Sequence, residues 1–217
     1  MASRESGVPS GKTRVAGYIL AGGASSRFGR DKALVELGGE AMLERTCELM
    51  AKATGAEPTI VGEAASYREF GAVCITDRWP GEGPLGGIVT ALLHAQEVWP
   101  KGNWNLILSC DMPFLTLEWL AHLCERAGRS EAQAVLARSA KGPESLCACW
   151  RTDAVEALQR GFERGLRKMT DGIALLSSEM LDENEWKRFD HSGRLFWNMN
   201  TPEDYEAARR VLQTERQ

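Results

Sequence analysis

Short apolar runs alternate along this chain with segments in which apolar residues recur every three or four positions. The runs are rich in Val, Ile, Leu and aromatic residues, which predicts strands; they are VAGYIL, PTIVG, AVCIT, WNLILSC, AQAVLAR, LCACW and LFWNM. The periodic segments predict helices; they are AMLERTCELMAKA, GGIVTALLHAQEV, LEWLAHLCERA and DAVEALQRGFE. Strands separated by helices favour a largely parallel sheet covered on both faces.

This alternation predicts an α/β layer sandwich. LCACW follows AQAVLAR too closely for a helical crossover, so part of the sheet is expected to be antiparallel. Residues 1–14 show no apolar periodicity and are expected to be a flexible leader. No linker divides the remainder, so we expect one domain over residues 15–217.

Composition narrows the classes of protein that remain. The 217 residues carry a net charge of -4, which argues against a general nucleic-acid or membrane-surface binder. No apolar stretch is long enough to span a bilayer and the N-terminus lacks a signal-peptide apolar region, so we expect a cytoplasmic protein. Most of the six cysteines lie in apolar runs without C-x-x-C spacing, which favours reduced thiols over disulfides or a zinc site.

The stretch LAGGASSRFGRDKAL follows the first predicted strand directly. Gly22 and Gly23 lack a Cβ, so the backbone there can turn its N–H groups toward an anion. Arg27 and Lys32 add two positive charges, the first planar and the second mobile. The loop therefore suits a triphosphate, although a tight surface turn with solvated charges is the alternative.

Two aspartates come after apolar strands, where open α/β sheets bind ligands. Asp111 in CDMPF and Asp77 in ITDRWP are candidates for holding a hard cation, since Mg²⁺ takes one or two carboxylates together with phosphate oxygens and water. For both residues a structural turn or helix cap is the alternative. A charge-neutralising site of this kind can transfer a group at phosphate without a nucleophilic side chain.

The stretch GEGPLGGI is expected to open a helix, with Pro84 in the first turn. Free N–H groups there can contact a nucleobase or phosphate, and Leu85 and Gly86 belong to the same candidate surface. Close packing of the helix on the sheet explains the glycines equally well.

Five stretches, taken in order, resemble the motif set of the MobA-like nucleotidyltransferases, and within them the molybdenum cofactor guanylyltransferases. They are LAGGASSRFGRDKAL, the aspartate of ITDRWPGEGPLGGI, CDMPF, PESLCACWR and NMNTPEDY. The similarity runs from about Val15 to Tyr205. It implies a Rossmann-like three-layer nucleotidyltransferase fold and transfer of GMP from GTP to molybdopterin, with release of pyrophosphate. It also implies Mg²⁺ as cofactor and transient contacts with other proteins of molybdenum cofactor synthesis.

The resemblance also assigns roles to single residues. Leu20, Ala21, Gly22 and Gly23 would line the guanine and phosphates, Lys32 would contact the phosphates, and Asp77 would meet the nucleotide. Asp111 would bind Mg²⁺. The family often has an asparagine after its second strand, whereas Gly62 and Glu63 occupy that region here.

The C-terminal motifs allow two interpretations. Thr201 and Pro202 are typical of a helix start, while Asn198 and Asn200 are candidates for bordering the acceptor pocket. Arg167 and Lys168 are candidates for the phosphate-bearing acceptor, or belong to a solvated face.

Two other functions fit the same residues. One is a different nucleotidyltransferase, either a cytidylyltransferase for the same pterin or an enzyme for a sugar or alcohol phosphate; the LAGG glycines favour guanine, because the cytidylyl relatives resemble LAAG. The other is a noncatalytic nucleotide-binding protein, disfavoured by Lys32, Asp77 and Asp111 all being present.

Overall fold

The computed structural model describes residues 14–22, 32–63, 67, 70, 72–99 and 103–215. Within these residues seven strands form one sheet, in the order β5-β4-β1-β6-β8-β7-β9. Their bounds are β1 Val15–Leu20, β4 Thr59–Gly62, β5 Val73–Thr76, β6 Trp104–Ser109, β7 Ala134–Ser139, β8 Gly142–Arg151 and β9 Ser178–Leu181. Neighbouring strands are parallel except around β8, which runs antiparallel to both β6 and β7. The predicted α/β fold, with a mostly parallel sheet and an antiparallel part, is confirmed.

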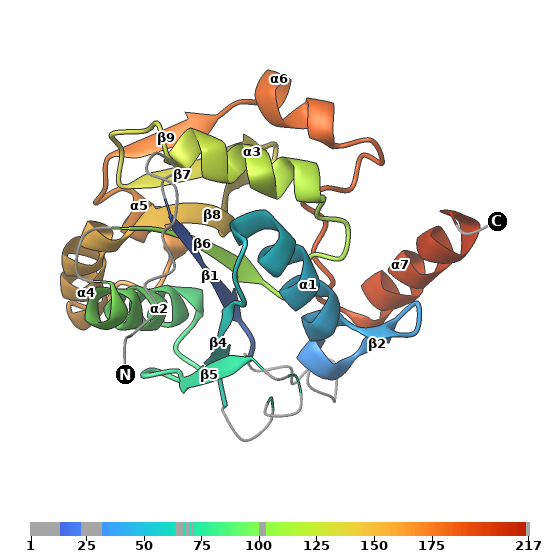
Figure 1. The fold of residues 1–217 in the computed structure, drawn as a ribbon, viewed down its shortest axis with the longest axis horizontal. Helices are drawn as coiled ribbons and strands as arrows, with labels where there is room; N and C mark the ends of the chain where they lie inside the picture. Colours follow the sequence, from blue (N-terminus) through green and yellow to red (C-terminus); the bar gives the residue numbers. More distant parts are fainter. Residues whose placement is uncertain are drawn as a thin grey trace, which may run out of the picture.

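Helices cover both faces of the sheet (Figure 1). Their bounds are α1 Met42–Thr54, α2 Pro84–Val98, α3 Leu117–Ala127, α4 Val155–Glu163, α5 Met169–Ile173, α6 Glu183–Trp186 and α7 Pro202–Glu215. Helices α1 and α3 pack together on one face, and α2 packs with α4 on the other. None of the helices in the described part of the chain is long and apolar enough to cross a membrane.

The helix starts follow from local sequence. Thr116 caps α3, because its side chain accepts a hydrogen bond from the backbone of Trp119. At α7 the Thr201 hydroxyl accepts from the backbone N–H of Asp204 at 3.2 Å, and the Asp204 carboxylate accepts from the backbone N–H of Thr201 at 2.9 Å. This reciprocal capping confirms the predicted helix start at Thr201 and fixes the loop immediately before it.

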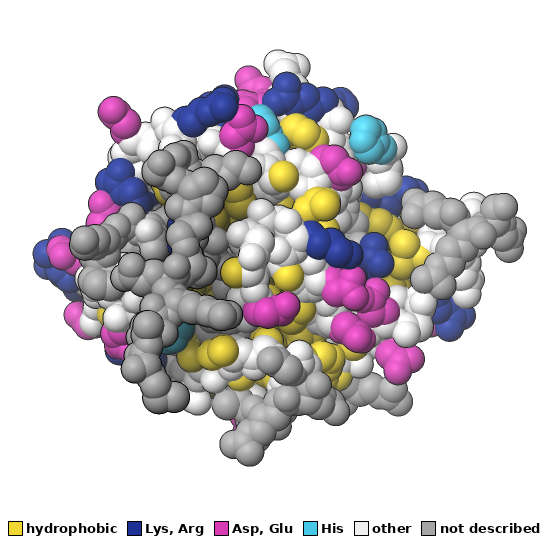
Figure 2. All heavy atoms as spheres, viewed as in Figure 1, with side chains coloured by type: hydrophobic (Ala, Val, Ile, Leu, Met, Phe, Trp, Pro, Cys, Tyr) yellow, Lys and Arg dark blue, Asp and Glu magenta, His cyan; other side chains and the backbone are white. Residues whose placement is uncertain are grey.

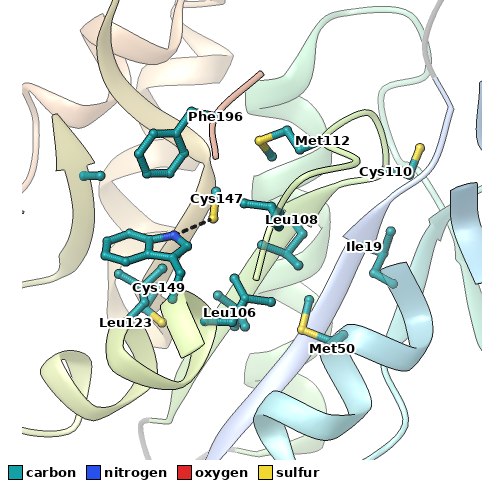
Figure 3. Close-up of a cluster of buried hydrophobic side chains, with 14 of the residues drawn as sticks. Ile19, Met50, Leu106, Leu108, Cys110, Met112, Leu123, Cys147, Cys149 and Phe196 are labelled. Atoms are coloured by element: carbon teal, nitrogen blue, oxygen red, sulfur yellow. Dashed lines mark hydrogen bonds between the residues drawn. The ribbon is translucent and has the colours of Figure 1, made fainter. Parts of the chain in front are cut away.

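The core between the sheet and helices α1 and α3 is apolar and closely packed (Figure 3). Ile19, Leu106 and Leu108 from the central strands are fully buried there. Trp119 donates its indole N–H to the sulfur of Cys147 at 3.3 Å. Burial raises the pKa of the Cys147 thiol to about 12. All six cysteines are free, as predicted; Cys110, Cys147 and Cys149 are buried, whereas the other three are only partly buried.

The predicted strand LFWNM is wrong. Residues 195–199 form turns and irregular backbone, although Leu195, Phe196 and Met199 are buried as an apolar run predicts. Their backbone groups bond locally, since the N–H of Trp197 donates to Arg194 and the N–H of Met199 donates to the carbonyl oxygen of Asp111. The edge of the sheet next to β7 is taken instead by β9, whose sequence SEML carries too few apolar residues to predict a strand.

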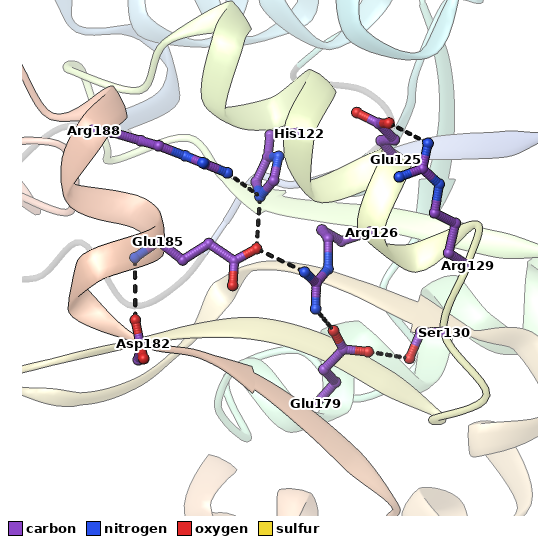
Figure 4. Close-up of polar contacts among 9 residues, drawn as sticks. All are labelled: His122, Glu125, Arg126, Arg129, Ser130, Glu179, Asp182, Glu185 and Arg188. Carbon is purple, nitrogen blue, oxygen red and sulfur yellow. Dashed lines mark hydrogen bonds and ion pairs between the residues drawn. The ribbon is translucent and has the colours of Figure 1, made fainter.

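A network of charged side chains ties β9 and α6 to α3 (Figure 4). Arg126 on α3 contacts Glu179 of β9 and lies 3.0 Å from Glu185 of α6. His122 Nε2 lies 2.9 Å from the same Glu185 carboxylate, and Ser130 donates to Glu179. These contacts hold β9 and α6 against α3.

Candidate active site

A cleft of about 980 Å³ opens at the carboxyl ends of the parallel strands. Its lining comes from the ends of β1, β4, β5 and β6, from β8 and from the start of α2: Leu20, Ala21, Gly22, Val61, Gly62, Glu63, Tyr67, Thr76, Asp77, Pro80, Gly81, Gly83, Pro84, Gly87, Ser109 and Leu146. Open α/β sheets bind ligands at this edge. Leu20, Ala21, Gly22, Asp77 and Pro84, five of the predicted nucleotide-binding residues, lie in this lining.

Gly62 lies against the backbone of Ala21, and both residues line the cleft. An ideal Cβ at Gly62 would lie 2.1 Å from the carbonyl oxygen of Ala21, so no side chain fits there. The N–H of Ala21 donates to Val61 at 2.9 Å and extends the pairing of the two strands. Glu63, which follows Gly62, is exposed and lies at the cleft. Gly22 has a φ of 113°, the positive value predicted for this turn.

Asp111 lies beside the cleft, in the loop after β6. Ser109, at the end of β6, donates its hydroxyl to the Asp111 carboxylate at 2.7 Å. Burial raises the pKa of Asp111, while the Ser109 hydrogen bond and the nearby charge of Lys32 oppose that rise. Sequence reasoning missed Ser109, whose signal was a hydroxyl at the end of an otherwise apolar strand.

The C-terminal motif reaches this same loop. Lys32, at the start of the short 3-10 helix Lys32–Leu34, donates to the Asn200 side chain at 3.0 Å. Met199, the residue before Asn200, donates its N–H to the Asp111 carbonyl oxygen at 2.8 Å. The structure thus brings Lys32, Asp111 and Asn200 together, and Asn198 lies in the same loop. Gly23 and Arg27 lie outside the described residues.

Asp77 follows β5 and has a structural role as well as a place in the cleft. One of its carboxylate oxygens accepts from the backbone N–H of Trp79 at 3.1 Å and lies 3.0 Å from the Thr90 hydroxyl on α2. The turn considered as an alternative for this residue is therefore present. Its other oxygen has no hydrogen bond to any described residue.

The start of α2 divides its residues between cleft and core. Pro84 and Gly87 line the cleft, whereas the Leu85 side chain is fully buried. An ideal Cβ at Gly86 would lie 3.2 Å from Trp79 and 3.3 Å from Phe162, so Gly86 serves close packing. For Leu85 and Gly86, which were predicted to bind nucleotide, only the backbone is left for such a contact.

Arg167 and Lys168 are not brought to Asn198 and Asn200 by any contact among the described residues. The Arg167 guanidinium pairs with Glu82 in the loop before α2 and lies 3.9 Å above the centre of the Phe162 ring. Lys168 is exposed and precedes α5. On the face shown in Figure 2, basic and acidic side chains of described residues are interspersed rather than gathered by sign.

No group of three or more His, Cys, Asp or Glu side chains among the described residues has a geometry that could hold a metal ion. Asp111 offers a partly buried carboxylate with one oxygen engaged by Ser109. That donor set fits Mg²⁺ only when phosphate oxygens and water complete the coordination, as is usual where Mg²⁺ binds with a nucleotide.

Comparison with known proteins places the chain in a family. The pattern described as the MobA-like NTP transferase domain matches residues 17–179. The chain belongs to the MobA-like NTP transferase family. Among curated proteins, a probable molybdenum cofactor guanylyltransferase of Opitutus terrae is 34% identical, with 90% of this chain and 95% of that protein covered. A molybdenum cofactor guanylyltransferase of Vibrio cholerae is 30% identical, with coverage of 86% and 87%.

Solved structures agree with this MobA-like assignment. Molybdopterin-guanine dinucleotide biosynthesis protein A from Archaeoglobus fulgidus superposes with a TM-score of 0.78 at 26% identity, covering 92% of this chain and 99% of that one. A CMP:2-keto-3-deoxy-manno-octonic acid synthetase has a TM-score of 0.66 at 13% identity, covering 94% of this chain and 100% of that one, which shows a shared fold alone. The predicted resemblance and the nucleotidyltransferase fold are confirmed.

Proposed function

We propose that this protein transfers GMP from GTP to molybdopterin and releases pyrophosphate. The observation that carries the proposal is the meeting of Lys32, Asp111 and Asn200 beside the glycine-lined cleft. None of the three lines the cleft itself, but Ser109, which does, bonds to Asp111. The curated relatives named molybdenum cofactor guanylyltransferase, which match most of the chain, support the choice of substrates.

GTP is proposed to lie along the cleft. Lys32 marks the phosphate end, because its ammonium group is the cation found next to Asp111 among the described residues. The nucleoside then extends past Gly22 toward Asp77 and the start of α2, where Gly83 and Pro84 present the positive end of the helix. Gly23 and Arg27 are proposed to complete the phosphate cradle.

Mg²⁺ is proposed to bind Asp111 together with the phosphates. When bound, it would neutralise charge on the phosphate oxygens and so make the α-phosphorus more electrophilic. Ser109 holds one carboxylate oxygen of Asp111 and leaves the other available. The backbone bond from Met199 fixes the loop that carries Asp111.

The proposed reaction needs no covalent intermediate. A phosphate oxygen of molybdopterin attacks the α-phosphorus of GTP, and the bond from that phosphorus to the bridging oxygen breaks with its electron pair leaving on pyrophosphate. Lys32, held by Asn200, stabilises the negative charge that develops on the departing group. Asn198 and Asn200 are proposed to border the incoming acceptor. Arg167 and Lys168, first considered for that task, lie near the start of α2 and before α5 respectively.

We also propose the compartment in which the enzyme works and how its acceptor reaches it. Six free cysteines agree with a reducing compartment such as the cytoplasm. Molybdopterin is proposed to arrive through transient contacts with other proteins of the same pathway.

A nucleotide panel tests the function. Purified protein is mixed with molybdopterin, Mg²⁺ and one of GTP, CTP, ATP or UTP, and pyrophosphate release is followed. We expect release with GTP that depends on molybdopterin, and much slower release with CTP. Faster turnover of CTP would assign a cytidylyltransferase, and nucleotide binding without any release would assign a noncatalytic binding protein.

A further inference from the structure

A second hollow of about 440 Å³ lies between the β7–β8 turn and the loop before α7. The residues that give it its chemistry are Lys141, Glu144, Trp186, Arg194, Phe196 and Trp197. With Asp190, which also lines it, the hollow combines aromatic walls, two basic side chains and two carboxylates, and it has no part in the nucleotide cleft described above.

The hollow adjoins the nucleotide cleft along β8. Leu146 lines the cleft and Glu144 lines the hollow. The two residues lie roughly 7 Å apart along β8, in the stretch between Pro143 and Ala148 where the register of β8 with β7 shifts. From the other side, Trp197 of the hollow comes two residues before Met199, whose N–H binds the Asp111 loop. The two spaces therefore meet near Asp111.

The walls of the hollow suit a planar ring. Trp186 and Phe196 contact each other edge to face, with ring centres 5.2 Å apart. Trp197 stacks one face on Phe114 at 5.5 Å, nearly parallel, and also lines the hollow. Trp186 and Phe196 are only 8% and 7% exposed, so the partly exposed Trp197 offers most of the aromatic surface on which a heteroaromatic ligand can stack.

Glu144 is the carboxylate in the hollow with hydrogen-bonding capacity to spare. Ser139 donates to it at 2.5 Å, and no other described residue donates a hydrogen bond to it. The other carboxylate, Asp190, already accepts from the backbone N–H groups of Arg194 and Leu195 at 2.9 Å and 3.0 Å. A half-buried carboxylate of this kind is best satisfied by a ligand that offers adjacent N–H donors.

We propose that this hollow binds the pterin ring of the acceptor, with Glu144 accepting hydrogen bonds from the ring N3–H and the 2-amino group. These two donors lie side by side on a 2-amino-4-oxo ring and match the two oxygens of a carboxylate. The ring stacks against the aromatic walls, and the phosphate end of the acceptor extends toward Asp111. The inference rests on the proposed guanylyl transfer for the identity of the acceptor.

Direct binding tests the hollow without any turnover. Fluorescence titration compares pterin (2-amino-4-oxopteridine) with lumazine (2,4-dioxopteridine), which lacks the 2-amino donor. We expect wild-type protein to bind pterin about tenfold more tightly than lumazine, and Glu144→Gln to lose most of that preference. Glu131→Gln, which changes an exposed carboxylate elsewhere, is the matched control and should behave as wild type. Absence of pterin binding, or an unchanged preference in Glu144→Gln, overturns the proposal.

Kinetics separate this inference from the proposed function. In Glu144→Gln the KM for molybdopterin should rise about tenfold, while kcat and the Kd for GTP stay close to wild type. If Glu144→Gln transfers GMP with an unchanged KM for molybdopterin, the pterin site is wrong and the proposed function is retained. If the protein prefers pterin in a way that depends on Glu144 but transfers no GMP, the pterin site is retained and the proposed function is wrong.

Discussion

Replacing Gly62 with alanine should damage both stability and catalysis. The ideal Cβ would lie 2.1 Å from the Ala21 carbonyl oxygen, about 1 Å inside the 3.0 Å limit below which real contacts are essentially never found. The atom that it meets is backbone, so no side-chain rotation relieves the contact. Strands β1 and β4 must separate at their carboxyl ends, which also strains the bond from Ala21 N–H to Val61.

The cost combines two effects. Overpacking of a buried site costs about 1 to 3 kcal/mol, and weakening one backbone hydrogen bond adds about 1 kcal/mol. We therefore expect Gly62→Ala to lower the free energy of unfolding by about 2 to 4 kcal/mol. Turnover should fall by about 100-fold, because Ala21 and Gly22, which line the cleft, are displaced by about 1 Å.

Urea unfolding and pyrophosphate release measure the two effects. Gly87→Ala is the matched control for stability, because its nearest neighbours are the ends of the Leu20 side chain at 3.3 Å and 3.4 Å, and these can move. That variant should stay within about 1 kcal/mol of wild type. A Gly62→Ala protein as stable as Gly87→Ala would show that the Ala21 carbonyl oxygen does not exclude a side chain at position 62.

Three further variants test separate parts of the account. Lys32→Met should lower kcat at least about 100-fold with little change in thermal stability, and a kcat near wild type would contradict its charge-stabilising role. Asp204→Ala removes the cap of α7 and should cost about 1 kcal/mol near pH 7. Backbone hydrogen bonds from Asn200 and Thr201 lower the pKa of Asp204, so the carboxylate stabilises the fold above pH 3.8, its usual pKa. This stabilisation is lost as the pH falls below that value. Unfolding curves of wild type and Asp204→Ala near pH 7 and below pH 3.8 check the sign. Glu179→Gln should cost about 1 kcal/mol near pH 7, since the ion pair with Arg126 is partly exposed. Burial tends to raise the pKa of Glu179, but hydrogen bonds from Arg126 and Ser130 outweigh this effect and lower the pKa. The difference in unfolding free energy between Glu179→Gln and wild type should therefore vanish as the pH falls well below 4.5. A difference that persisted there would contradict the ion pair.

Local sequence patterns were sufficient to predict most helices and strands of the fold. Helix α3 has the predicted bounds, because a threonine cap, apolar residues at helical spacing and a following glycine all agree. The stretch LFWNM shows what local sequence patterns fail to predict. An apolar run predicts burial, but only the hydrogen-bond partners of its backbone decide whether it is a strand, and here those partners are Arg194 and Asp111.

The candidate site was predictable residue by residue but not as an arrangement. Asp111 and Lys32 stood out by charge and position after strands. The bond between Lys32 and Asn200 joins residues 168 positions apart, and no local pattern in either segment predicts it. Leu85 shows a second limit, since its place in a glycine-rich loop predicted a ligand contact but did not predict that its side chain fills the core and leaves only its backbone for that contact.

The fate of the α-phosphate of GTP shows whether Asp111 supports direct transfer to the pterin. GTP labelled at the α-phosphate is incubated with molybdopterin, Mg²⁺ and either wild-type protein or Asp111→Asn, and the label is traced to pterin product, free nucleotide or protein. We expect wild type to move the label to the pterin in step with pyrophosphate release and to leave no label on the protein. We expect Asp111→Asn to fold normally but to transfer the label at least about 100-fold more slowly. Label retained on the protein, or near-normal transfer by Asp111→Asn, would contradict this expectation.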